Sequence, residues 1–292
     1  MPAISQLYIY PIKSCAGIAL NEARLLPYGL EYDRNWMLVD GTGYFVTQRV
    51  LPRMALIRTE LGDGALVVQA PGMPPLRTPL DAEQLAHAPR VAATVWRDTV
   101  TALDCGDEAA RWFSDFLGTP LRLVRFDPAA ERIASRAWTG NIVAPTRFAD
   151  GYPLLVIGEA SLDDLNERLD SQGVDSIPMN RFRPNVVITG LEAYEEDYVE
   201  TLVVAAGADE VSLRIVKPCA RCPVPDIDQA TGAPDPRWPN EPTDTMSTYR
   251  AYRADSRLDG AVTFGQNAVV AAGAGGMLAL GQDVDAQLRF ED

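Results

Sequence analysis

Histidine is nearly absent from this sequence of 292 residues, which contains His87 and no other. A histidine-rich zinc site, a facial triad of two histidines and a carboxylate, and a Ser-His-Asp device all need imidazole groups. His87 lies in a polar, loop-like stretch, DAEQLAHAPR, and is interpreted as inert. The chemistry of this chain is therefore expected to proceed without imidazole.

Long apolar runs and cysteines are also scarce. No stretch approaches the roughly 18 apolar residues that span a bilayer. The N-terminal MPAISQLYIYPIKS lacks the basic and apolar regions of a signal peptide. Four cysteines are too few for a disulfide scaffold in a chain of this size. These features favour a soluble globular protein of the reducing cytoplasm, with no membrane partner.

Positive charge is in deficit, since the formal net charge is −14. Binding to nucleic acid or to an anionic membrane needs a dominant basic surface, so neither is expected as a partner. An anionic small molecule can still bind where basic residues cluster. Of the 26 basic residues only Lys13 and Lys217 are lysines, and each lies two residues before a cysteine. Either these positions need a compact ammonium group, or the two lysines survive by chance.

Glycine and proline divide the chain into short segments typical of β-meanders. In the first half, strands are expected at residues 6–12, 35–39, 43–48, 53–61, 65–69, 91–103 and 121–126. In the second half, they are expected at residues 153–157, 185–189, 201–204, 211–216, 261–270, 277–280 and 284–290. Apolar residues at helical spacing predict helices over 107–117, ended by Gly118, and over 162–169, with Ser161 as N-cap.

Periodicity is lost between residues 127 and 150, which marks the expected boundary between two halves. The sequence therefore predicts a mainly β (α+β) fold of two β-barrel-like domains with a few short helices, the first over residues 1–126 and the second over 127–292. The run 223–242, rich in proline and aspartate, is expected to be a long functional loop.

The pair Cys219-Ala-Arg-Cys222 is the sharpest local motif, and alone it has several interpretations. A zinc knuckle needs two more soft ligands, an iron–sulfur cluster needs four thiolates, and a thioredoxin-like pair should open a helix. Two buried cysteines without chemistry are the remaining alternative. A single thiolate can also bind a heavy transition metal whose other sulfur ligands come from an organic molecule. Arg221 would place positive charge beside the thiols, and Pro223 would hold Cys222 extended.

Eight short motifs then appear in order along nearly the whole chain. They are YPIKSCAG at 10–17, DRNW at 33–36, TQR at 47–49, FADGYP at 148–153, RFRPN at 181–185, KPCARC at 217–222, the turn from Asp228 to Gly232, and FGQN at 264–267. The first three resemble the MOSC N-terminal β-barrel domain, and the others resemble the MOSC domain. Within that superfamily the sequence is similar to the amidoxime-reducing, N-hydroxylated-compound reductase family.

This resemblance implies a molybdenum–molybdopterin cofactor between the two domains, with one protein cysteine on the metal. It also implies reduction of N–O bonds in amidoximes, hydroxylamines and N-hydroxylated bases. Some bacterial relatives append a ferredoxin-like domain, and eukaryotic relatives carry a membrane anchor. Neither is expected here, so electrons would come from a separate ferredoxin- or cytochrome-type donor protein. No pyridoxal phosphate site is expected.

Ten residues within these motifs are the predicted site: Lys13, Ser14, Arg34, Asp150, Arg183, Asn185, Ala220, Arg221, Cys222 and Asn267. The basic members would bind the cofactor phosphate, because charge-assisted hydrogen bonds are the strong ones. Ser14 and the asparagines would supply neutral hydrogen bonds, and the amides of Ala220 and Arg221 would act as donors. The resemblance makes Cys222 the metal ligand and the catalytic residue. Cys219 would pack behind it, and Cys15 would have no ligand role.

Two other functions stay open at this point. The chain could carry the molybdenum cofactor, or a persulfide on a cysteine, for delivery to another protein. It could also be a dithiol redox protein that uses both members of the cysteine pair.

Overall fold

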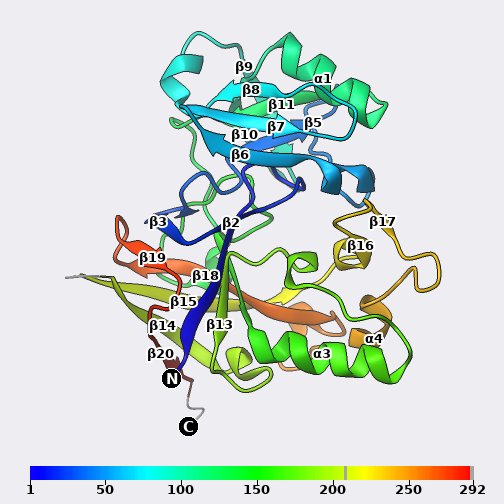
Figure 1. Cartoon of the computed structure of the whole chain (residues 1–292). Helices are drawn as coiled ribbons and strands as arrows, with labels where there is room; N and C mark the ends of the chain where they lie inside the picture. The colour runs from blue at the N-terminus through cyan, green and yellow to red at the C-terminus, as the bar shows by residue number, and fades with distance from the viewer. Residues whose placement is uncertain (207–208, 290–292) are drawn as a thin grey trace.

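The fold is mainly β with a few short helices, as the sequence predicts (Figure 1). A computed structural model describes residues 1–206 and 209–289. Its α-helices are α1 (Asp107–Leu117), α2 (Arg136–Thr139), α3 (Glu159–Ser171) and α4 (Thr243–Ser247). In the described part of the chain, no helix is long and apolar enough to cross a membrane.

The largest sheet has eight strands and combines both ends of the chain. Its order is β2 (Ile18–Leu20), β1 (Ala3–Ile9), β13 (Val186–Thr189), β12 (Leu154–Gly158), β18 (Thr263–Ala272), β15 (Asp209–Ala220), β14 (Val199–Ala206) and β20 (Val284–Leu288). Ile4 N donates to Gln282 O at 3.0 Å, and Val284 N donates to Pro2 O at 2.8 Å. These bonds join the β1 side of the sheet to the β20 side, so the sheet curls round an apolar interior.

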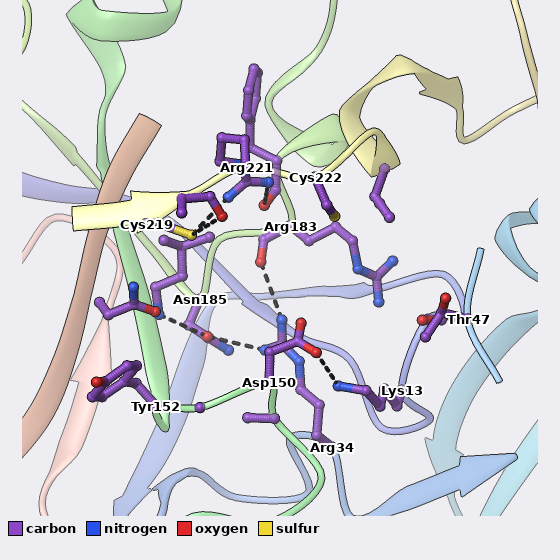
Figure 2. A pocket seen from close by; sticks show the side chains of 18 of the residues that line it. Lys13, Arg34, Thr47, Asp150, Tyr152, Arg183, Asn185, Cys219, Arg221 and Cys222 are labelled. Carbon is purple, nitrogen blue, oxygen red and sulfur yellow. Dashed lines mark hydrogen bonds and ion pairs between the residues drawn. The ribbon is translucent and has the colours of Figure 1, made fainter. Parts of the chain in front are cut away.

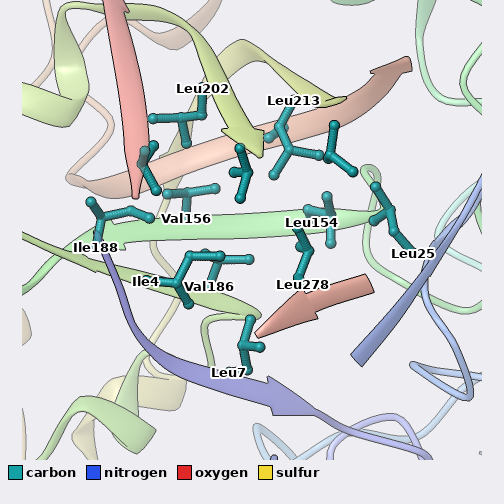
Figure 3. Close-up of a cluster of buried hydrophobic side chains, with 14 of the residues drawn as sticks. Ile4, Leu7, Leu25, Leu154, Val156, Val186, Ile188, Leu202, Leu213 and Leu278 are labelled. Atoms are coloured by element: carbon teal, nitrogen blue, oxygen red, sulfur yellow. The ribbon is translucent and has the colours of Figure 1, made fainter. Parts of the chain in front are cut away.

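That interior is filled by branched aliphatic side chains from strands distant in sequence (Figure 3). Ile4, Leu154, Val186 and Leu213 are at most 1% exposed. Alternate residues of each strand point inward, because side chains alternate between the two faces of a sheet. Burial of each such side chain contributes roughly 1.5–3 kcal/mol.

The first half of the chain forms two smaller sheets, drawn above the large sheet in Figure 1. One is β5 (Trp36–Val39), β11 (Arg122–Phe126), β10 (Asp98–Asp104) and β9 (Arg90–Val95); the other is β6 (Arg58–Gly62), β7 (Ala65–Gln69) and β8 (Leu76–Pro79). Helix α1 buries Trp112, Phe113 and Phe116 in the core of this half. Gly118 ends the helix with φ of 72°, which confirms the predicted cap.

Two small ladders complete the strands. The first is β19 (Met277–Ala279), β3 (Glu22–Leu26) and β4 (Gly29–Leu30), and the second is β16 (Ile227–Asp228) with β17 (Ala233–Pro234). Together with β1, the β3–β19 pairing links the first residues of the chain to its last strands. A division into domains 1–126 and 127–292 stays a prediction, and backbone pairing crosses it.

Several predicted strands are wrong in extent or kind. The strand expected at 6–12 lies at Ala3–Ile9, followed by Tyr10 and Pro11 in irregular backbone. Residues 43–48 make only isolated bridges, because the Asp40 carboxylate accepts from Thr42 N and Tyr44 N and closes a turn. Residues 52–56 form a 3₁₀ turn with proline at its first position, and β6 starts only at Arg58.

Further corrections concern one hairpin and one helix cap. Residues 91–103 form two strands, β9 and β10, joined at Trp96, whose φ is 58°. Helix α3 begins at Glu159, and Ser161 Oγ donates to Glu196 Oε2 at 2.7 Å, so Ser161 is not the N-cap. The strand predicted at 284–290 is seen up to Leu288, and Phe290 lies outside the described residues.

Candidate functional site

All ten residues of the predicted site line one pocket beside the end of β15 (Figure 2). They come from segments far apart in sequence: the turn after β1, the loop before β5, the loops before β12 and β13, the end of β15, and β18. We use the name cationic side for Lys13, Ser14, Arg34, Asp150, Arg183 and Asn185. The name sulfur side denotes Cys219, Ala220, Arg221, Cys222 and Asn267.

The backbone around the pocket is held in an unusual conformation. In the described residues, seven non-glycine residues have positive φ, and four of them line this pocket: Ser14 (66°), Arg34 (47°), Trp96 (58°) and Arg183 (59°). Left-handed backbone in a residue with a Cβ costs of order 1–3 kcal/mol and persists only where the surroundings impose it. The concentration of such residues here makes this pocket the candidate functional site.

The Arg34 guanidinium lies in a buried network on the cationic side. Its Nη1 donates to Asp33 Oδ2 at 2.6 Å and to Asn185 Oδ1 at 3.0 Å, and its Nη2 donates to Arg183 O at 3.3 Å. The Arg34 side chain is 14% exposed and that of Asp33 is 2% exposed. Burial raises the pKa of Asp33, although Arg34 acts in the opposite direction. Arg34 is thus fixed in position, and it does not sit in an isolated surface ion pair.

Asn185 ties this network to the large sheet. Its Oδ1 also accepts from Leu155 N at 3.1 Å, and its Nδ2 donates to Tyr8 O at 3.2 Å. Asn185 is 1% exposed, so these bonds form away from water. The asparagine connects β1, β12 and the approach to β13 at the pocket wall.

On the cationic side, Arg183 is the cation that has no ion-pair partner among the described residues. Its guanidinium lies over the Tyr10 ring, with Cζ 4.2 Å from the centroid. Burial lowers its pKa to about 10. Its Nη2 is buried and has no hydrogen-bond partner in the described structure. A buried donor left unpaired costs about 1–3 kcal/mol, so this group is prepared for an acceptor that enters the pocket.

Lys13 is already paired. Its Nζ donates to Phe148 O and to Asp150 Oδ1, both at 2.8 Å. Trp96 Nε1 donates to the same carboxylate oxygen at 3.0 Å. Desolvation by itself would raise the pKa of Asp150. The charge of Lys13 and the hydrogen bonds from Lys13 and Trp96 have the larger effect, and they hold this pKa well below its usual range. Burial likewise lowers the pKa of Lys13. Lys13 is therefore paired with Asp150 as Arg34 is with Asp33, and Arg183 is left without a carboxylate among the described residues.

The two cysteines of the sulfur side have different surroundings. Cys219 packs against the core cluster that contains Phe182, and Arg221 Nη1 lies 3.2 Å from its Sγ. Cys222 follows the end of β15 and is half-buried. Cys15 is fully buried in a separate core cluster, which raises its pKa to about 12, and it does not line the pocket.

One expected donor on the sulfur side is already used. The amide of Arg221 donates to Val262 O at 2.8 Å. The expectation that this amide donates to a ligand is therefore wrong. The Arg221 guanidinium still lines the pocket, and its Nη2 donates to Phe182 O at 2.9 Å. Its Nε is buried without a partner among the described residues.

Sequence reasoning missed several residues of the pocket wall, among them Thr47, Arg49, Trp96, Tyr152 and Phe182. The guanidinium of Arg49 lies 4.4 Å from the centroid of the Trp96 ring. The motif Thr47-Gln48-Arg49 was the signal that could have identified Arg49. Trp96 carries no such signal, because it reaches the pocket only through the β9–β10 turn.

The comparisons with known families agree with this arrangement. The profile of the MOSC N-terminal beta barrel domain matches residues 1–120, and that of the MOSC domain matches residues 144–285. The chain belongs to the MOSC family.

Three relatives show how far this similarity extends. The chain is 34% identical over 261 residues to Mitochondrial amidoxime reducing component 2 of Bos taurus and 33% identical over 261 residues to Mitochondrial amidoxime-reducing component 1 of Homo sapiens. Each match covers 85% of this chain and 72% of the relative. It is 30% identical over 243 residues to Molybdenum cofactor sulfurase of Bos taurus, covering 78% of this chain and 27% of that protein.

The charges in this MOSC pocket suit a phosphate-bearing cofactor that brings its own metal ligands. Its described lining includes five cations (Lys13, Arg34, Arg49, Arg183 and Arg221) and one carboxylate, that of Asp150. In the described residues, no three His, Cys, Asp or Glu side chains gather to hold a metal ion. A half-buried thiol opposite unpartnered guanidinium donors is the donor set that such a cofactor needs.

Proposed function

We propose that this chain is a molybdenum-cofactor-dependent reductase of N-hydroxylated small molecules: amidoximes, hydroxylamines and N-hydroxylated bases. The observation that carries the proposal is the single pocket in which Cys222 faces an excess of positive charge. The similarity to two proteins named amidoxime reducing components supports the substrate class. We place the activity in the cytoplasm.

The cofactor would lie between the two sides of the pocket. Arg183 and Arg34 would bind its phosphate, and Ser14, Asn185 and Asn267 would hydrogen-bond the pterin or the phosphate. Cys222 would provide the one protein sulfur on the metal. When bound, the cofactor supplies two-electron redox chemistry at molybdenum, while the protein holds it in a fixed orientation.

Two further residues of the pocket would have positioning roles, Arg221 for the cysteine turn and Asp150 for the substrate. Arg221 holds Cys219 and the Phe182 carbonyl, and so fixes the turn from which Cys222 projects. Asp150, held by Lys13 and Trp96, remains ionised and lies on the opposite wall. It would orient a substrate N–H group, because a carboxylate accepts hydrogen bonds.

The direct test is the molybdenum and pterin content of the purified protein, measured beside reduction of benzamidoxime. We expect turnover with a reduced viologen dye or with a reconstituted ferredoxin- or cytochrome-type donor. NADH alone should give none, since no glycine-rich dinucleotide motif opens a βαβ unit in the sequence. Robust turnover with NADH alone would contradict the requirement for a separate donor protein.

A cofactor or sulfur carrier is the second candidate, and the similarity to a protein named molybdenum cofactor sulfurase favours it. Such a carrier would contain the cofactor, or a persulfide on a cysteine, without reducing benzamidoxime. Molybdenum content without reductase activity under any donor would therefore decide for the carrier. Absence of metal, pterin and cysteine persulfide together would leave the dithiol redox protein.

A further inference from the structure

A second cavity of about 610 Å³ adjoins the cofactor pocket. Trp96, Asp150, Gly151 and Tyr152 line both, so the two spaces share a wall. Tyr44 and Trp138 also line this cavity, and they do not line the cofactor pocket. Its size is that of a small-molecule site, and its aromatic lining suits a flat organic molecule.

Lys217 is the unusual residue of this cavity. Its Nζ lies 5.4 Å from the centroid of the Trp138 ring and 5.7 Å from that of Tyr152. In the described structure, Nζ makes no ion pair and donates no hydrogen bond to a protein group. Burial lowers the pKa of Lys217; the nearby Cys219 acts in the opposite direction, and the charge of Arg257 lowers the pKa further. Aromatic rings stabilise an ammonium only partly, and they leave its hydrogen-bond donors free.

The carboxylates of the cavity cannot balance this charge. Asp98 accepts from Arg132 Nε at 2.9 Å, and Asp150 is held by Lys13. Both acids are therefore already neutralised by other cations. An uncompensated ammonium in a partly enclosed space creates a local positive potential, which stands out in a protein of net charge −14.

Two exposed aromatic side chains that line the cavity indicate what kind of molecule the cavity could bind. Tyr44 is 42% exposed and Trp96 is 44% exposed, and each ring packs against Phe45. The Arg49 guanidinium lies over the Trp96 ring, 4.4 Å from its centroid. An aromatic anion could bind such a surface in two ways: its ring would pack on the exposed aromatic side chains, and its negative charge would pair with the ammonium.

We propose that the cavity lined by Trp96, Trp138, Tyr152 and Lys217 is a substrate subsite that binds aromatic carboxylates. The carboxylate would lie on Lys217 Nζ and the ring between the aromatic side chains, while the N–O group extends into the cofactor pocket. This inference rests on the proposed function for the reacting end of the substrate. The binding of the anionic end does not depend on the metal, so the two can be tested separately.

The first experiment measures binding of benzoate and of neutral benzamide to the purified protein by calorimetry or tryptophan fluorescence. We expect wild type to bind benzoate at least about tenfold more tightly than benzamide, as one charge-assisted hydrogen bond allows. Lys217→Met and Lys217→Gln should weaken benzoate at least about tenfold and leave benzamide unchanged. Arg253→Gln removes the same charge from a side chain that is 77% exposed outside the cavity, and it should change neither affinity.

Two outcomes would overturn the subsite: wild type that does not distinguish benzoate from benzamide, or Lys217 variants that retain benzoate affinity. A second experiment compares the reduction of benzamidoxime and its 4-carboxylate. Lys217→Met should raise KM for the carboxylate about tenfold, with kcat and the KM of benzamidoxime unchanged. Equal KM values for the two compounds in wild type would contradict the subsite without contradicting the reductase function. If benzoate binding depends on Lys217 but neither compound is reduced, the subsite stands and the proposed reductase function fails.

Discussion

On the cationic side of the pocket, buried side-chain hydrogen bonds join segments that are distant in sequence, whereas the sulfur side follows the end of β15, where the Arg221 side chain bonds Cys219 and Phe182 O. Asn185 alone accepts from Arg34 and Leu155 N and donates to Tyr8 O. On the sulfur side, the amide of Arg221 pairs with Val262 O, and Cys222 simply follows the strand end. Mutations of side chains that carry these buried bonds should therefore affect both folding and binding, while a change at Cys222 should affect binding alone.

The largest effect on stability is expected for Asn185→Ala. The change leaves Leu155 N and the Tyr8 carbonyl without partners in the interior, at about 1–3 kcal/mol for each buried group. We expect a loss of about 3 kcal/mol in the free energy of unfolding, measured by urea denaturation of cofactor-free protein. Asn267→Ala is the matched control, since Asn267 is only half-buried and its amide donates to Lys217 O and Pro218 O alone among the described residues. Equal losses for the two variants would erase the difference between the sides.

Arg183→Met separates binding from stability within the cationic side. Arg183 is half-buried, its Nη2 is buried without a hydrogen-bond partner, and it lacks an ion-pair partner among the described residues, so an apolar side chain of similar length should fit without loss. We expect the unfolding temperature of cofactor-free protein to stay the same or rise. Pterin retained after purification should fall at least about tenfold, because a charge-assisted contact to phosphate is lost. A variant that retains full pterin would remove Arg183 from the phosphate site.

A smaller effect concerns the loop after the cysteines. Asp226 Oδ1 accepts from Thr243 N and Oγ1, and burial raises the pKa of Asp226 to about 6. The folded protein thus holds this proton more tightly than the unfolded chain. The stability contribution of Asp226 is fullest below pH 4 and falls as pH rises to 6.

Asp226→Asn keeps an oxygen acceptor and removes the charge. It should stabilise the protein by about 1 kcal/mol at pH 7, once solvent screening is allowed for, and not at pH 4. Urea denaturation at the two pH values measures this. A gain of the same size at both would show that charge at Asp226 is not its cause.

The sequence predicted correctly those helices and strands whose formation depends on residues close together in the chain. Helix α1 has the predicted bounds, since its aromatic stripe and Gly118 act within a few turns. The residues of the predicted site were found through short motifs, and the fold brings all ten to one pocket. Their roles in binding stay predictions.

The remainder depends on contacts between distant segments. Nothing near Ser14, Arg34 or Arg183 in the sequence signals left-handed backbone, because such conformations in residues other than glycine are imposed by tertiary structure. The pairing of Lys13 with Asp150 joins residues 137 positions apart. The pairing of β1 with β13 likewise has no local signature, and the first strand lies away from its predicted position.

The central claim is that Cys222, and not Cys219, is the molybdenum ligand. The decisive measurement is the molybdenum content of Cys222→Ser and Cys219→Ser, each assayed beside reduction of benzamidoxime. Cys222→Ser should abolish reduction and retain some pterin, because the contacts of the cationic side survive, and its unfolding temperature should match wild type. Cys219→Ser should keep a measurable fraction of metal and activity. If Cys219→Ser loses the activity and Cys222→Ser retains it, the account of the sulfur side is wrong.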